Sequence, residues 1–168
     1  MGTIRNITGI LVCLLNTVWA AQLPSPYEVT TKKTGRYVNE GVFIGGEKTV
    51  TSTTLKDIRR GPQGQGERLV FDFEGNGDFQ NKVPYFLLNI NAKSNKLILS
   101  VWSDVSYDHN SKKIAGVLKK SRFVRSVNVM PRLEDGLATM EVNLKSAKNL
   151  KVEAFYLTHP ARIILDLM

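Results

Sequence analysis

The chain has little of the chemistry that cysteine and histidine supply. Its 168 residues include one cysteine, Cys13, and two histidines, His109 and His159. No His-x-x-x-His or Glu-x-x-His spacing occurs, and the motifs of serine hydrolases and phosphate-binding loops have no supporting context. Asp104 and Asp108 beside His109 form the only cluster of acids with a histidine, and a polar loop is the simpler interpretation. We therefore expect a non-enzyme with no catalytic residue, no metal and no cofactor.

Charge is almost absent from the first twenty residues. Arg5 is the only charged residue among them, an apolar run covers residues 10–15, and Val18 and Ala20 precede a possible cleavage point. This pattern is typical of a secretory signal peptide, and it is too short for a permanent membrane span. We predict a signal peptide at 1–20 and an exported chain, with an uncleaved N-terminal anchor as the alternative.

Acidic residues are fewer than basic residues in this chain. The chain has 23 Lys and Arg against 15 Asp and Glu, a net charge of +8. Cleavage would remove Arg5 and leave +7, and it would also remove Cys13, so the mature chain could form no disulfide. An exported protein with this charge meets anionic envelope surfaces rather than nucleic acid. A charge that only maintains solubility is the alternative.

The apolar pattern has the period of strands rather than helices. Apolar residues alternate over 68–73 and again over 140–144, between turns rich in Gly, Asn and Pro. We predict an all-β sandwich over residues 51–168. Residues 21–50 hold two prolines and four glycines, which favours a leader or tether with at most one short strand around 37–44.

One segment has helical periodicity. In a helix over residues 112–120, Ile114, Val117 and Leu118 fall on one side and four lysines on the other, with Ser111 as a candidate cap. The sequence therefore predicts one short helix within a basic connection at 102–123.

That connection separates two similar units, at about 55–101 and 124–167. In each unit a basic strand leads through a glycine-containing turn to an alternating strand, and a second hairpin ends on an apolar strand. Such repetition predicts two related sheets whose apolar faces cover each other.

A short sequence pattern, which we call the duplicated phrase, occurs twice, as RLVFDF at 68–73 and as RIILDL at 162–167. Residues four apart share one face of a strand but lie roughly 13 Å apart, so they cannot form an ion pair within it. Arg68 and Asp72, like Arg162 and Asp166, should therefore point outward. They are free to pair with a neighbouring strand or to face a ligand, and cross-strand pairing is the simpler interpretation.

The connection carries the strongest binding signal. From residue 112, near its end, to residue 125, just after it, the chain has no acid and six cations: Lys112, Lys113, Lys119, Lys120, Arg122 and Arg125. Such a patch could bind carboxylates or phosphates, or it could be a solvated helix face. Tyr85, Trp102 or Tyr107 could add an aromatic platform for sugars, although Trp102 ends an apolar strand and is better interpreted as core.

The two units, with "LKDIRR", "ERLVFDFEG" and the closing "HPARIILDL", resemble the AMIN domain of exported cell-wall amidases and type IV pilus secretins. The resemblance covers about residues 50–168 and implies a β-sandwich, a periplasmic location in a Gram-negative-type bacterium and peptidoglycan binding. The stretch at 104–121 is longer and more basic than is usual there. The sequence thus predicts a non-catalytic envelope-targeting domain. The alternative is a protein-interaction module of a secretin, pilus or amidase assembly.

Overall fold

The fold is described from a computed structural model, covering residues 25–168 except 92–93, 109–110 and 134–135. The predicted signal peptide at 1–20 and Cys13 lie outside these residues. The elements are β1 (Tyr27–Glu28), β2 (Glu40–Gly45), β3 (Ser52–Gln63), β4 (Gly66–Glu74), a 3-10 turn (Gly77–Phe79), β5 (Phe86–Asn91), β6 (Lys96–Trp102), β7 (Asp104–Tyr107), α1 (Ser111–Lys119), β8 (Val124–Leu133), β9 (Leu137–Leu144), β10 (Val152–Thr158) and β11 (Ala161–Leu167). None of the helices among the described residues is long and apolar enough to cross a membrane.

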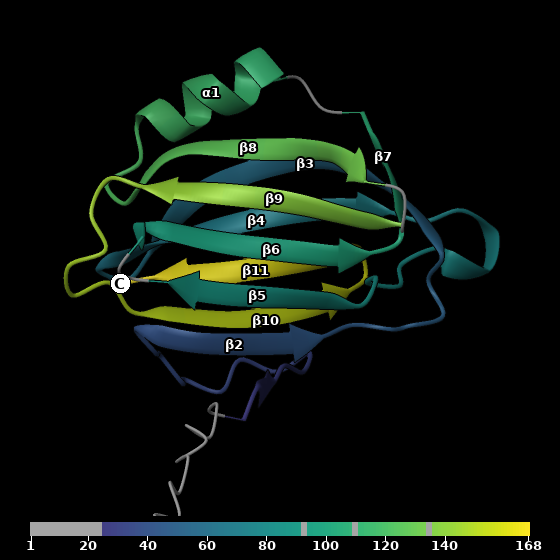
Figure 1. The fold of residues 1–168 in the computed structure, drawn as a ribbon, viewed down its shortest axis with the longest axis horizontal. Helices are drawn as coiled ribbons and strands as arrows, with labels where there is room; N and C mark the ends of the chain where they lie inside the picture. Colours follow the sequence, from purple (N-terminus) through teal and green to yellow (C-terminus); the bar gives the residue numbers. More distant parts are fainter. Residues whose placement is uncertain (1–24, 92–93, 109–110, 134–135) are drawn as a thin grey trace, which may run out of the picture.

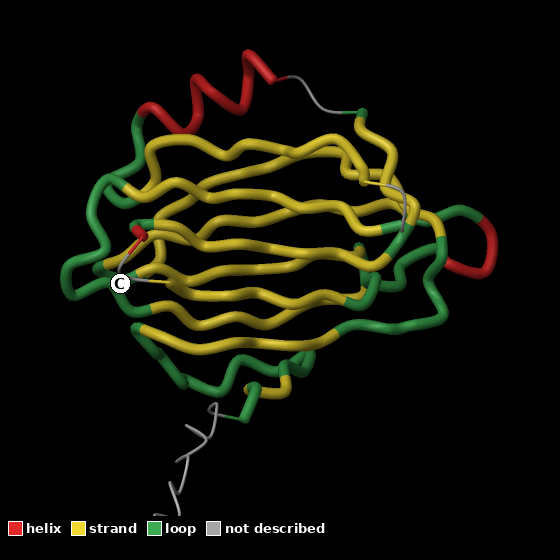
Figure 2. Tube along the Cα trace, viewed as in Figure 1, coloured by secondary structure: helices red, strands yellow, loops and turns green. Residues whose placement is uncertain are grey.

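The strands form two sheets that face each other (Figure 1). The first sheet has the order β1-β2-β5-β6-β9-β8, and the second has the order β10-β11-β4-β3-β7. This confirms the predicted all-β sandwich with one short helix. Figure 2 shows that helix at one end of the strand layers.

The predicted repeat is visible in the strand order. The run β5-β6-β9-β8 of the first sheet corresponds, strand for strand, to β10-β11-β4-β3 of the second. Each unit therefore gives one hairpin to each sheet, and the two units meet in both sheets, where β6 pairs with β9 and β11 pairs with β4. The sheets are related as predicted, but neither is built from one unit alone.

Alternation of side chains places the core between the sheets. In β9 every second residue from Ala138 to Leu144 is buried, and in β4 the buried residues include Leu69, Phe71 and Phe73. The largest fully buried side chains come from both units and both sheets: Phe71, Phe86, Leu55, Ile58, Leu69, Leu88, Leu97, Leu99, Leu118, Met140, Ile163 and Leu165. The apolar residues that recur at every second position of the sequence thus form the inward face of the sandwich.

The N-terminal segment corrects one prediction. The strand predicted around 37–44 is present as β2, but the segment also carries β1, and it is not a tether because β2 pairs with β5 along its whole length. Phe43 is 3% exposed and Val50 is fully buried, so both belong to the core. Val38 also bridges to Val152 at the edge of the second sheet, which links the segment to both sheets.

Helix α1 covers the open edge of the sandwich at β8 and β3 (Figure 1). Ile114 and Leu118 are buried and Val117 is half-buried, as the helical wheel predicts. The helix begins at Ser111, one residue before the predicted start, and ends at Lys119.

Candidate functional site

The duplicated phrases are neighbours in the second sheet. β4 and β11 run antiparallel in a register that sets Arg68 opposite Asp166 and Arg162 opposite Asp72. Each arginine therefore faces the aspartate of the other copy. Arg68 binds Asp166 through two hydrogen bonds, of 2.7 Å from Nε and 2.8 Å from Nη2, and Arg162 Nε lies 3.2 Å from Asp72 Oδ1. The predicted cross-strand pairing is confirmed.

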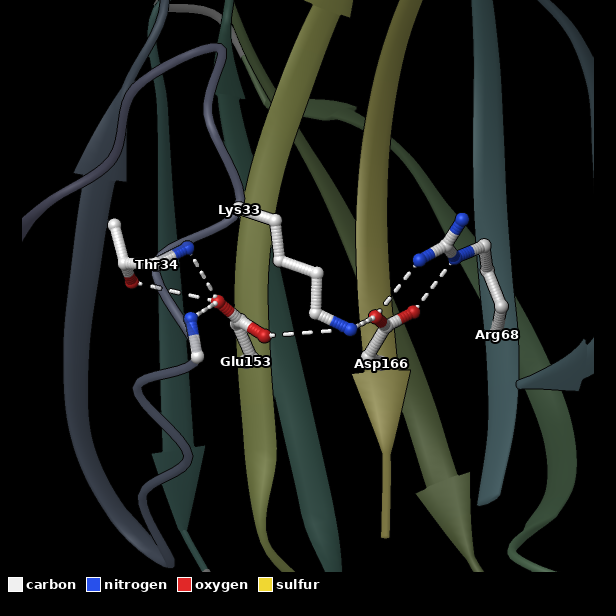
Figure 3. A network of polar contacts seen from close by, with 6 residues as sticks. Lys33, Thr34, Arg68, Glu153 and Asp166 are labelled. Atoms are coloured by element: carbon white, nitrogen blue, oxygen red, sulfur yellow. Dashed lines mark hydrogen bonds and ion pairs between the residues drawn. The ribbon is translucent and has the colours of Figure 1, made fainter. Parts of the chain in front are cut away.

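The N-terminal segment covers one of these pairs (Figure 3). Lys33 Nζ lies 2.6 Å from Asp166 Oδ2 and 3.6 Å from Glu153 Oε2. The backbone N–H groups of Thr34 and Gly35 donate to Glu153 Oε1 at 2.8 and 2.6 Å. Asp166 is fully buried, so it does not lie on an open outer face and cannot contact a ligand there.

The charges of this network stabilise one another. Burial opposes ionisation of Asp166, but hydrogen bonds from Arg68 and Lys33 outweigh it and lower the pKa of the carboxyl. The same contacts raise the pKa of Lys33 and of Arg68. A second cluster forms around Asp72, which also accepts from Arg59. The four outward-face residues predicted as possible ligand contacts are therefore paired with each other.

The predicted basic patch is only partly available to a ligand. Lys113 Nζ binds Asp57 Oδ2 at 2.5 Å, and the side chain of Lys112 lies outside the described residues. The other four cations are exposed and form no ion pair with any described residue. We call these four the basic surface: Lys119, Lys120, Arg122 and Arg125.

A buried acid holds the turn that carries the basic surface. Glu67, 5% exposed, accepts hydrogen bonds from the Ser121 hydroxyl at 2.5 Å and from the Arg122 N–H at 2.7 Å. Arg60 Nη1 lies 3.2 Å from the same carboxylate and 3.0 Å from the carbonyl of Lys120. Glu67 thus fixes the turn between α1 and β8 without neutralising its exposed cations. This role could not be predicted from the sequence, because it depends on β4 lying beneath the turn.

Two clefts lie beside α1. One, of about 430 Å³, lies between the helix and β8, and Lys119 and Arg125 are among its lining residues. The other, of about 320 Å³, is lined by Arg60, Lys113, Gly116, Val117 and Lys120. The basic surface therefore offers cationic groups beside hollows on both sides of the helix.

The aromatic residues divide differently from the prediction. Trp102 is not a core residue: it is 41% exposed and its ring centroid lies 5.5 Å from that of Tyr85. Lys48 Nζ lies 5.2 Å from the centroid of the Tyr85 ring. A hollow of about 570 Å³ runs along the outer side of β2 and β5, and its lining includes Tyr85, Val42 and Leu87. The prediction that Trp102 is a core residue was wrong. Trp102 is the last residue of β6, and its side chain lies on the outward face of that strand.

Among the described residues, no cluster of His, Cys, Asp and Glu could hold a metal ion. His109 lies outside those residues, and Asp108 binds Lys56 at 2.7 Å. His159 hydrogen-bonds locally with the Thr158 hydroxyl at 3.0 Å. Comparison with models of protein families, with curated proteins and with solved structures finds no match to this chain.

Proposed function

We propose that this chain is a non-catalytic, exported module that binds peptidoglycan in the periplasm and localises a machine of the cell envelope. The observation that carries this proposal is the basic surface: four exposed cations, without ionic partners among the described residues, around one turn. Peptidoglycan presents carboxylates on its muramyl groups and its peptides. Lysines offer them mobile point charges, and arginines can bind them through two parallel hydrogen bonds.

The rigid support of the turn adds to this proposal. Glu67 and Ser121 fix the backbone between α1 and β8, so the cations need little ordering of the main chain when a ligand binds. The cleft of about 320 Å³ on the other side of α1 gives the sugar and peptide groups of the polymer a place to lie. The AMIN-like phrases and the predicted signal peptide are the further support for an envelope ligand.

The outer face of the first sheet favours a second candidate function, a protein-interaction module of a secretin, pilus or amidase assembly. Trp102 and Tyr85 lie on that face beside an apolar hollow. Tryptophan and tyrosine are enriched among the residues that dominate protein interfaces, and Trp102 is exposed here. A partner that binds there would leave the basic surface free.

Sedimentation with purified sacculi tests the first proposal. The variant Lys120→Glu/Arg122→Glu should bind about tenfold more weakly at low salt, because two attractive contacts become repulsive. Lys148→Glu/Lys151→Glu is the matched control: it changes the net charge equally, at exposed lysines of the β9–β10 connection. Added salt should weaken the wild-type interaction. No sedimentation at low salt, or equal losses in the two variants, would contradict peptidoglycan recognition by the basic surface.

A further inference from the structure

The cleft between α1 and β8, which we call the α1–β8 pocket, lies at the edge of the sandwich where α1 packs on β8 and β3. Ile58 lines it from β3 of the second sheet, while Val127 and Val129 line it from β8 of the first sheet. Ile114 and Leu118 of α1 complete the apolar part of its lining. The walls of the pocket therefore come from both sheets and from the helix, rather than from one strand alone.

The pocket is lined by apolar, buried residues inside it, and by charged, exposed residues at its mouth. Ile58, Ile114 and Leu118 are at most 5% exposed, whereas Lys119 and Arg125 are exposed cations that form no ion pair with any described residue. Its volume, about 430 Å³, lies in the range of roughly 300–1,000 Å³ that small-molecule sites occupy. An apolar cavity of about 150 Å³ already accepts a benzene ring. The space suffices for a hydrocarbon tail.

We infer that the α1–β8 pocket binds a single-tailed anionic amphiphile, such as a fatty acid. The tail would lie against Ile58, Leu118 and Val127, and the head group would meet Lys119 and Arg125. Both halves of the ligand are then matched, because burial of the tail is favourable and two cations compensate the charge of the head. This ligand is chemically distinct from peptidoglycan, and the inference does not depend on the proposed function.

Two other occupants fit less well. A peptide that extends the first sheet would lie along β8, yet the pocket crosses from β8 to β3. A bilayer surface is held by exposed aromatic and aliphatic anchors. The large exposed hydrophobics among the described residues are Trp102, Tyr107, Met130 and Met168, and none of them lines this pocket.

Titration of the full-length protein with dodecanoate, below the concentration at which it forms micelles, tests the inference by calorimetry. We expect saturable binding of one molecule per chain. Ala115→Trp should abolish it, since Ala115 is an exposed helix residue that lines the pocket, and a large ring there fills the space. Arg125→Gln should weaken binding about tenfold through loss of a charge-assisted hydrogen bond, and Lys148→Gln should not.

Three results would overturn the inference. The first is no saturable binding of dodecanoate by the wild-type protein. The second is that Ala115→Trp binds dodecanoate as tightly as the wild type does, and that inorganic phosphate alone binds with the same affinity as dodecanoate. The cations would then bind anions without the pocket. The third is binding to phosphatidylglycerol vesicles with none to free dodecanoate. Ala115→Trp keeps all four cations of the basic surface, so its sedimentation with sacculi should be unchanged, and the two proposals can fail separately.

Discussion

At the scale of single residues, the two copies of the duplicated phrase form ion pairs with each other. The arginine of each copy pairs with the aspartate of the other. The sequence placed Arg68 and Asp72 on one face, and likewise Arg162 and Asp166, because side-chain alternation in a strand is a local property. It could not supply the register between β4 and β11, which depends on strands almost a hundred residues apart. Nor could it show that Lys33 closes over Asp166, because that contact depends on where the N-terminal segment packs.

Asp166→Asn tests how much this network stabilises the fold. The change keeps the shape of the side chain but leaves Arg68 and Lys33 without their shared anion. Removal of one partner from a buried ion pair costs about 3–5 kcal/mol, and partial exposure of the two cations favours the lower value. We expect a loss of about 3 kcal/mol in the free energy of unfolding, measured in urea. Glu74→Gln removes an exposed carboxylate at the end of β4 in the same sheet and should have little effect; equal losses in both variants would contradict the assigned role.

The pH dependence of stability follows from the same carboxyl. The pKa of Asp166 is lower in the folded protein than its ordinary value of 3.8, so its contribution is complete above 3.8 and is lost as the pH falls through the folded pKa. Lys33 has a raised pKa, so its contribution is lost only as the pH rises above 10.5. Urea unfolding from neutral pH down to about pH 2 should therefore show the wild type and Asp166→Asn converging in acid. A constant difference across that range would show that Asp166 acts without its charge.

At the scale of elements, the predictions succeeded where the pattern is local and strong. The α1 helix and the alternating strands β4 and β9 follow from periodicity alone. The strand predicted around 37–44 is present as β2, with the sequence EGVFIG, but the segment was not predicted to join the core, because β2 begins and ends beside glycines and buries only Phe43 fully. Its strand character comes from pairing with β5, which is a tertiary contact.

Two glycines of the β3–β4 hairpin give a matched test of element packing. A Cβ on Gly66 would lie 2.1 Å from the backbone oxygen of Leu167, while a Cβ on Gly61 would meet nothing within 4 Å. Gly66→Ala must therefore push β4 away from the end of β11, which should cost about 1–3 kcal/mol. Gly61→Ala should be close to neutral. Thermal unfolding of the two variants checks this, and equal midpoints would contradict the close approach of Gly66 to Leu167.

At the scale of the whole molecule, internal repetition predicted two related sheets but not how the units share them. Each unit might have formed its own sheet, because hairpin order within a unit is the same in either arrangement. The observed exchange pairs β6 with β9 and β4 with β11, so each sheet contains a pairing between units in its interior. It also places the connection between the units at the open edge of the sandwich, beside β8 and β3, which is why the basic surface lies beside a pocket rather than on a flat face.

This arrangement predicts that neither unit folds alone. Residues 25–107 would lack β9 and β11, and residues 108–168 would lack β4 and β6, so each fragment would expose apolar faces and unpaired strand edges in both layers. We expect each fragment by itself to give poorly dispersed amide signals in NMR and no cooperative thermal transition. An equimolar mixture should recover both, since the pairings between units supply what each fragment lacks. Cooperative unfolding of either fragment alone would contradict the exchange of hairpins, because it would require a unit that completes its own core.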